Sequence, residues 1–244
     1  MAGDPAEGLL TAEEALAAAA ATSQMAIAAF VHVGKGLLTL MAGDAAEAEA
    51  ILEQGLVLAQ ECGDRPPLYN VLWALGETAR LRGEYARAEQ FLTDGLALVQ
   101  AHGDTSGRGY VLASLGHLFL ARGDAARAGR LFLESLAVRR DAGDAQGVTH
   151  CVEAVAGVAV ALGEPGRAAR LFAAAESLRQ TTGGAPSVGL AVREQAIATV
   201  KAALDDRAFE AAWADGWRMS LDAALAEAVE IGESDRWVEP LLSS

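Results

Sequence analysis

Apolar and polar positions follow a helical period along most of the chain. Between Ala88 and Val99, the apolar residues Phe91, Leu92 and Leu96 complete a single stripe of a helix. No long runs of β-branched residues with alternating polarity occur, so a sheet has little to start from. The pattern therefore predicts an all-α fold. The same stripe recurs in three other stretches: Ala48, Ile51, Leu52, Leu56 and Ala59; Ala128, Leu131, Phe132 and Leu136; and Ala168, Leu171 and Phe172.

The helical stretches repeat every 40 residues, and glycines mark two positions of the repeat. Helices often end at a glycine in the left-handed conformation. Each glycine of the first series is followed by Asp44, Glu84, Asp124 or Glu164, an acidic residue that favours the start of the next helix. These marks predict four helical hairpins over residues 25–184. The two series are Gly43, Gly83, Gly123 and Gly163, and Gly63, Gly103, Gly143 and Gly183.

A small residue also recurs within both helices of each hairpin. Glycine inside a helix costs about 0.5–1 kcal/mol relative to alanine. Its recurrence therefore indicates a close contact between the paired helices, and such pairs stack into a solenoid in which each repeat covers its neighbour. The first helices carry Gly36, Gly76, Gly116 and Ala156, and the second helices carry Ala48, Ala88, Ala128 and Ala168.

The hairpins resemble tetratricopeptide repeats, because the first helices carry Leu75-Gly76 and Leu115-Gly116 and the second helices carry an alanine at a fixed position. The 40-residue period departs from the common period of about 34 residues, and Gly-Asp replaces the closing proline. Longer repeats of this sort look like those of bacterial LuxR-type and related signal-transduction ATPase regulators of transcription. The resemblance covers residues 1–184. It implies a right-handed superhelical solenoid of antiparallel helix pairs that binds a protein or peptide.

The chain begins with the second half of a repeat. Residues 1–24 match the second helix of a hairpin whose first helix is absent, because the motif at residues 1–4 returns at residues 41–44. Two explanations stay open: the chain is a piece of a longer protein, or its open end pairs with another chain to give a homodimer.

The repeat phase fades after the break at residues 183–186, and residues 185–244 are predicted to form a C-terminal helical cap. Ser220 suits the N-cap of a helix that runs to about Ile231. We expect Trp213 and Trp217 to bury the last open face of the solenoid. The alternative is that these tryptophans form a lid or contact a partner.

Charge and cysteine usage narrow the classes of partner. The formal net charge is −14, which opposes direct binding to nucleic acid and to an anionic membrane surface. Cys62 and Cys151 are far apart and lie in no metal-ligand spacing, so we expect two reduced thiols. The apolar stretch from Ala15 to Val33 is interrupted by polar residues, and we predict a cytoplasmic chain without a membrane anchor.

No motif for catalysis or phosphate binding occurs in the sequence. The four histidines, His32, His102, His117 and His150, are scattered along the chain. The sequence therefore predicts neither an enzyme nor a site for a metal or cofactor.

In tetratricopeptide arrays, the first helices line the concave surface, and the repeat register assigns positions to that surface. The first hairpin gives an apolar set there, whereas the later hairpins give polar and aromatic side chains suited to a peptide or small polar ligand. The alternative is that these side chains only solvate the inner face, with Trp73 and Tyr110 packing between repeats. The predicted groove residues are Asn70, Trp73, Glu77, Arg80, Tyr110, His117, His150 and Glu153.

Three functions follow as hypotheses. The first is a non-catalytic scaffold for a protein or peptide, serving as the sensor or regulatory segment of a bacterial transcriptional regulator. The second is a sensor domain for a small-molecule metabolite. The third is a self-association module that uses the open N-terminal end.

Overall fold

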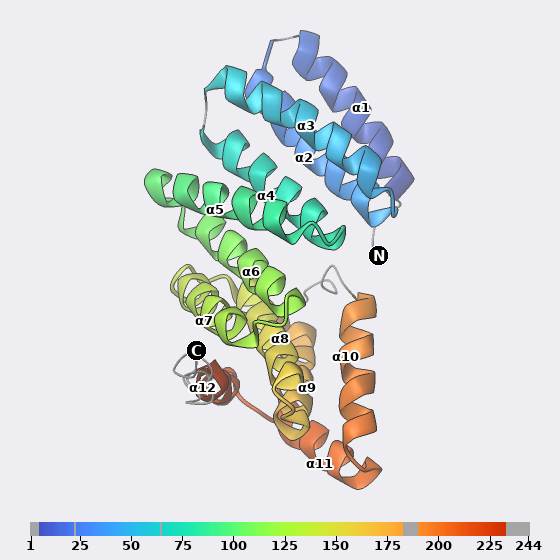
Figure 1. Cartoon of the computed structure of the whole chain (residues 1–244), viewed down its shortest axis with the longest axis vertical. Helices are drawn as coiled ribbons and strands as arrows, with labels where there is room; N and C mark the ends of the chain where they lie inside the picture. The colour runs from blue at the N-terminus through green and yellow to red at the C-terminus, as the bar shows by residue number, and fades with distance from the viewer. Residues whose placement is uncertain (1–4, 22, 64, 183–189, 233–244) are drawn as a thin grey trace. The chain divides into compact units, whose positions relative to one another are not determined.

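The computed structural model describes residues 5–21, 23–63, 65–182 and 190–232. These residues form twelve α-helices and no strand (Figure 1), so the predicted all-α fold is confirmed. The helices are α1 (Pro5–Ala21), α2 (Met25–Met41), α3 (Ala45–Cys62), α4 (Arg65–Leu81), α5 (Tyr85–His102), α6 (Thr105–Ala121), α7 (Ala125–Asp141), α8 (Ala145–Ala161), α9 (Pro165–Thr182), α10 (Leu190–Ala203), α11 (Asp206–Trp217) and α12 (Leu221–Gly232).

The chain divides into two compact units, Met1–Leu118 (unit 1) and Phe119–Ser244 (unit 2), with the boundary inside α6. Each unit is described on its own. None of the helices in the described residues combines the length and apolar character that crossing a bilayer requires.

Glycines end the helices as the repeat predicts. Seven glycines, spaced 20 residues apart from Gly43 to Gly163, have φ between +71° and +95°. This left-handed conformation carries no Cβ penalty for glycine. Ser23 takes the corresponding place in the first copy, with φ at +54°. The remaining predicted member, Gly183, lies outside the described residues.

The acidic residue after each turn glycine acts in one of two ways. Asp44 and Asp124 cap the following helix, because their Oδ1 atoms accept hydrogen bonds from the backbone N–H groups of Glu47 (3.0 Å) and Arg127 (2.9 Å). Glu84 makes no such cap. Its carboxylate instead pairs with arginines, so only the shorter aspartate side chain folds back onto its own helix.

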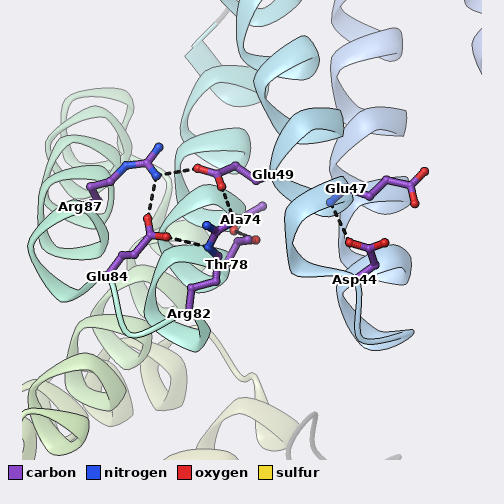
Figure 2. Close-up of polar contacts among 8 residues, drawn as sticks. All are labelled: Asp44, Glu47, Glu49, Ala74, Thr78, Arg82, Glu84 and Arg87. Atoms are coloured by element: carbon purple, nitrogen blue, oxygen red, sulfur yellow. Dashed lines mark hydrogen bonds and ion pairs between the residues drawn. The ribbon is translucent and has the colours of Figure 1, made fainter.

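An ion-pair network ties the hairpins α2–α3 and α4–α5 together in unit 1 (Figure 2). Glu49 on α3 lies 2.7 Å from Arg82, in the turn after α4, and 2.7 Å from Arg87 on α5. Glu84 lies 2.7 Å from the same two arginines. Two carboxylates therefore share two guanidinium groups across neighbouring hairpins.

The predicted close approach of paired helices is confirmed in unit 1. A Cβ atom added to Gly36 on α2 would lie 2.7 Å from Leu52 Cγ on α3, and one added to Gly76 on α4 would lie 2.6 Å from Leu92 Cγ on α5. Both leucines are fully buried. Each leucine thus fills the space that the missing side chain leaves, and the contact repeats after one period.

Unit 2 is built on the hairpin α8–α9. Helix α7 packs on α8, α11 packs on α9, and α12 packs on α7, α8 and α9. Arg170 on α9 holds Glu227 on α12 through two nitrogens, with Nε 3.0 Å and Nη2 2.5 Å from Oε1. Ser220 caps α12 as predicted, since its Oγ accepts from Ala223 N–H at 3.2 Å.

The expected role of the two tryptophans on α11 is wrong. Ala212 and Gly216 are the buried residues of this helix, and a Cβ atom on Gly216 would lie 2.1 Å from the Arg170 carbonyl oxygen. Trp213 is only half-buried, and Trp217 remains 39% exposed. Small residues pack α11 against α9, because only they allow the two backbones to approach so closely.

Candidate functional site

A small cavity opens between α4 and α6 in unit 1. Its volume is about 190 Å³. Three residues of α4, all within about one turn of that helix, face three residues of α6 across the cavity. The lining residues are Tyr69, Asn70, Trp73, Gly107, Tyr110 and Val111.

Two aromatic side chains form the outer part of this cavity. The rings of Trp73 and Tyr110 meet edge to face, with centroids 6.3 Å apart and planes at 64°. The Trp73 Nε1–H donates a hydrogen bond to Ser114 Oγ at 2.9 Å, which fixes the indole orientation. Tyr110 is 50% exposed. The pair therefore combines one fixed ring with one ring that is accessible to a ligand.

The inner part of the cavity is held by a buried tyrosine and an aspartate. The Tyr69 hydroxyl donates to Asp104 Oδ2, while Asp104 Oδ1 accepts from the Gly107 N–H at 2.9 Å and so caps α6. Burial, reinforced by the hydrogen bond to the charged Asp104, raises the pKa of Tyr69 to about 12. Burial alone would raise the pKa of Asp104, but hydrogen bonds from Gly107 and Tyr69 outweigh it and lower that pKa below its ordinary value.

Asn70 contributes a polar group to the same cavity. Its Nδ2 donates to the Pro66 carbonyl oxygen at 2.8 Å, one turn earlier on α4. This contact orients the amide and uses a donor, so the side-chain oxygen is the atom suited to accept a hydrogen bond from a ligand. A peptide N–H group offers such a donor.

The other predicted residues of unit 1 lie further along the helices. Glu77 and Arg80 on α4 pair with each other, with Oε2 2.7 Å from Nη2. Their charges largely offset one another, so this part of α4 does not favour a ligand of either sign. His117 on α6 is exposed. The structure thus brings together Asn70, Trp73 and Tyr110 of the predicted set.

The last two predicted residues, His150 and Glu153, belong to α8 in unit 2. Glu153 is engaged by Arg179 of α9 and by Arg193 of α10, whose Nε lies 3.5 Å away. Glu176 completes the ring, at 2.6 Å from Arg179 and 2.7 Å from Arg193. The Glu153 side chain is 11% exposed, so a ligand would have to displace an arginine to reach it.

His150 lies beside this ring of charges. Burial lowers the pKa of His150 below its ordinary value, and the nearby Glu153 carboxylate opposes that shift without cancelling it. The imidazole is therefore held neutral to lower pH than an exposed histidine. Its role as a ligand group stays a prediction.

Sequence reasoning missed Arg193. This residue follows Glu153 by 40 positions, and Ala196 follows Ala156 by the same interval. Helix α10 therefore continues the register of the first helices and pairs an arginine with the glutamate at the same register position of α8. The sequence contained a signal for this pairing: Ala196 repeats the small residue of the register, and Arg193 is opposite in charge to Glu153. The turn glycines that mark the earlier repeats are absent after residue 184.

Metal and thiol chemistry add nothing to the candidate site. Within residues 5–21, 23–63, 65–182 and 190–232, no three His, Cys, Asp or Glu side chains gather closely enough to hold an ion. Cys62 and Cys151 are both free thiols. Burial raises the pKa of the Cys151 thiol, so it is held in its unreactive protonated form.

Comparison with known proteins agrees with this architecture. Residues 25–101, which span α2 to most of α5, match the family model described as tetratricopeptide repeat. The crystal structure of BtubC (BKLC) from P. vanneervenii is similar in fold, with a TM-score of 0.65 and 15% sequence identity, and the match covers 99% of this chain and 94% of that chain. A search of curated proteins gives no match. The chain is therefore an all-α helical repeat protein with a tetratricopeptide-like region, a fold that typically serves as a non-catalytic scaffold for protein contacts.

Proposed function

We propose that unit 1 binds an extended segment of a partner protein, and that an apolar side chain of this segment enters the cavity between α4 and α6. The observation that supports this function is the pair of rings formed by Trp73 and Tyr110. A hydrogen bond to Ser114 fixes the Trp73 ring, and the Tyr110 side chain is half-exposed. Aromatic side chains of this kind supply large contact areas at low entropic cost in recognition sites.

The size of the cavity favours a side chain over a free metabolite. Pockets for drug-sized ligands are usually about 300–1,000 Å³, whereas this cavity has about 190 Å³. A single leucine, methionine or proline side chain suits that space. Asn70 then accepts a hydrogen bond from the peptide backbone beside the inserted side chain.

Peptide phage display on the full chain tests this function. We expect selected peptides to share an apolar anchor residue and to bind Tyr110→Ala at least tenfold more weakly by calorimetry. Tyr110→Phe retains the ring and should retain binding. Val57→Ala, an exposed apolar position on α3, serves as the matched control and should bind as the wild type does. Failure to select any peptide, or peptides indifferent to Tyr110→Ala, would refute the proposal.

The regulatory role is a further part of this proposal. Repeats with a 40-residue period resemble those of bacterial transcriptional regulators, which supports a function as their sensor segment. Two free cysteines are consistent with a cytoplasmic location. Sequencing the coding region upstream of Met1 tests the idea, because an in-frame nucleotide-binding domain is expected there and its absence would count against this role.

A further inference from the structure

Three aromatic side chains follow one face of α11 at four-residue intervals: Phe209, Trp213 and Trp217. The ring centroids of Phe209 and Trp213 lie 5.4 Å apart. With Glu210, Ala214 and Arg218, these residues line an open depression of about 330 Å³. We call this set the α11 stripe.

The α11 stripe begins beside the face of α11 that packs on α9 and winds outward along the helix. Helix α11 packs on α9 through Ala212 and Gly216. At about 100° per residue, Phe209 lies roughly 20° around the helix from Gly216, Trp213 roughly 60° and Trp217 roughly 100°. The packing against α9 therefore leaves Trp217 39% exposed and Trp213 and Phe209 half-buried. Exposed apolar patches with polar borders commonly mark protein interaction sites.

The charges beside the α11 stripe are complementary to one another. Glu210 lies in the second turn of the helix and Arg218 follows its end, eight residues later. When two such helices lie antiparallel about a two-fold axis at Trp213, Phe209 of one copy faces Trp217 of the other. Glu210 and Arg218 of the second copy then lie about 3 Å apart along the helix axis, given a rise of about 1.5 Å per residue. Their side chains span that offset easily.

We propose that a second copy of this chain covers the α11 stripe, so that α11 pairs antiparallel with α11 of the second copy. Such a contact is isologous and closes at two molecules, because the same surface serves on both sides. The aromatic rings are placed symmetrically about Trp213, and Glu210 and Arg218 carry opposite charges three residues before it and five residues after it; this arrangement selects a second copy over an unrelated partner. The inference does not rest on peptide binding by unit 1.

Forming the intermolecular ion pair requires little reorganisation. Arg218 Nη1 lies 3.3 Å from Asp215 Oδ1 within the same helix, and their side chains are 73% and 67% exposed. An exposed pair of this kind is weak, so Arg218 can exchange Asp215 for Glu210 of the second copy. Lys201 of α10 lies 5.0 Å from the Phe209 ring centre and covers the far end of the stripe. The contact thus involves one helix per copy and corresponds to a weak, concentration-dependent dimer.

Sedimentation equilibrium of the full chain, over about 1–200 μM, tests the proposal. We expect the average mass of the wild type to rise from 25.2 kDa towards twice that value. Glu210→Arg and Arg218→Glu should each weaken association at least tenfold, because each places like charges opposite one another. The double variant E210R/R218E should restore it. Circular dichroism verifies that each variant is folded.

Leu10→Glu is the control for the open N-terminal end, where Leu10 on α1 is 65% exposed. It should leave the association unchanged. A wild type that stays monomeric at about 200 μM overturns the proposal. So does a double variant that associates no better than the single variants, or an association that Leu10→Glu removes. Peptide binding by unit 1 should be unaffected in all these variants, so the two proposals fail independently.

Discussion

The indole Nε1 of Trp73 donates a hydrogen bond to the Ser114 hydroxyl oxygen across 2.9 Å, and the two residues are 41 positions apart in the chain. Since the repeat has 40 residues, each partner lies at nearly the same height on successive first helices, α4 and α6. The ring orientation at the candidate groove therefore depends on a contact between repeats, and it is sensitive to changes in either helix.

Replacement of Ser114 by alanine tests this dependence. Ser114 is only 6% exposed and Trp73 is half-buried, so Ser114→Ala removes the acceptor of an indole N–H that is partly shielded from water. We expect a loss of about 1–3 kcal/mol in the free energy of unfolding, measured by urea denaturation with circular dichroism. Thr199→Ala removes an exposed hydroxyl on α10 and should change the stability by less than about 0.5 kcal/mol. Equal effects of the two changes would contradict a structural role for the Trp73–Ser114 bond.

Two glycines on α2 should respond to alanine with opposite signs. A Cβ atom on Gly34 meets nothing within 4 Å, whereas one on Gly36 would lie 2.7 Å from two atoms of the buried Leu52. Gly34→Ala should raise the stability by about 0.5–1 kcal/mol through helix propensity. Gly36→Ala should lower it by about 1–3 kcal/mol through overpacking. Thermal unfolding of both variants measures the difference, and a stabilising Gly36→Ala would show that α2 and α3 are not in close contact.

Alkaline pH should weaken unit 1 through Tyr69. The folded state holds the pKa of Tyr69 at about 12, against an ordinary value of 10.0. Folding therefore retains a proton that the unfolded chain releases, so the contribution of this group is complete below pH 10 and is lost as the pH rises from 10 to about 12. A near-ultraviolet tyrosinate titration should show one step near pH 12 that disappears in Tyr69→Phe. A wild-type step that persists in this variant would assign the raised pKa to another residue.

The Glu49 network should make a measurable, salt-dependent contribution. Glu49 has a side chain only 17% exposed and contacts Arg82 and Arg87 from the next hairpin. Glu49→Gln should destabilise the chain by about 1 kcal/mol at low ionic strength, because a network exceeds a single exposed pair. The loss should shrink at about 1 M salt, where charges are screened within about 3 Å. Glu53→Gln, an exposed change on the same helix, is the control and should have little effect at either ionic strength.

The repeat register predicted much of the helical architecture because its cues are local. A left-handed glycine ends a helix wherever it occurs, and a missing Cβ at Gly36 or Gly76 implies a neighbour that fills the space. The sequence left two interpretations of Trp73 and Tyr110 open: they line the groove for a ligand, or they pack against each other between repeats. The register alone does not distinguish them, because it does not show how far a side chain reaches towards the next helix. In the structure, the same contact also lines the cavity.

The C-terminal region was less predictable for a physical reason. Without turn glycines to set the phase, the sequence around α11 indicates an amphipathic helix but not which face packs inward. Large aromatic residues suggested burial of Trp213 and Trp217, whereas the backbone of α9 admits only Ala212 and Gly216 at the contact. Steric fit to a neighbouring backbone outweighs hydrophobicity there, and such fit depends on coordinates.

The left-handed turn glycines also restrict how a chain of this type can lengthen. Each turn glycine ends its own helix, so an insertion inside a helix displaces the buried stripe of that helix from its neighbours, whereas later helices keep their own phase. Duplication of one hairpin, forty codons together, adds a first and a second helix at once and so reproduces the contacts that each hairpin makes with its neighbours. Growth of such a protein during evolution is expected to proceed in complete hairpins.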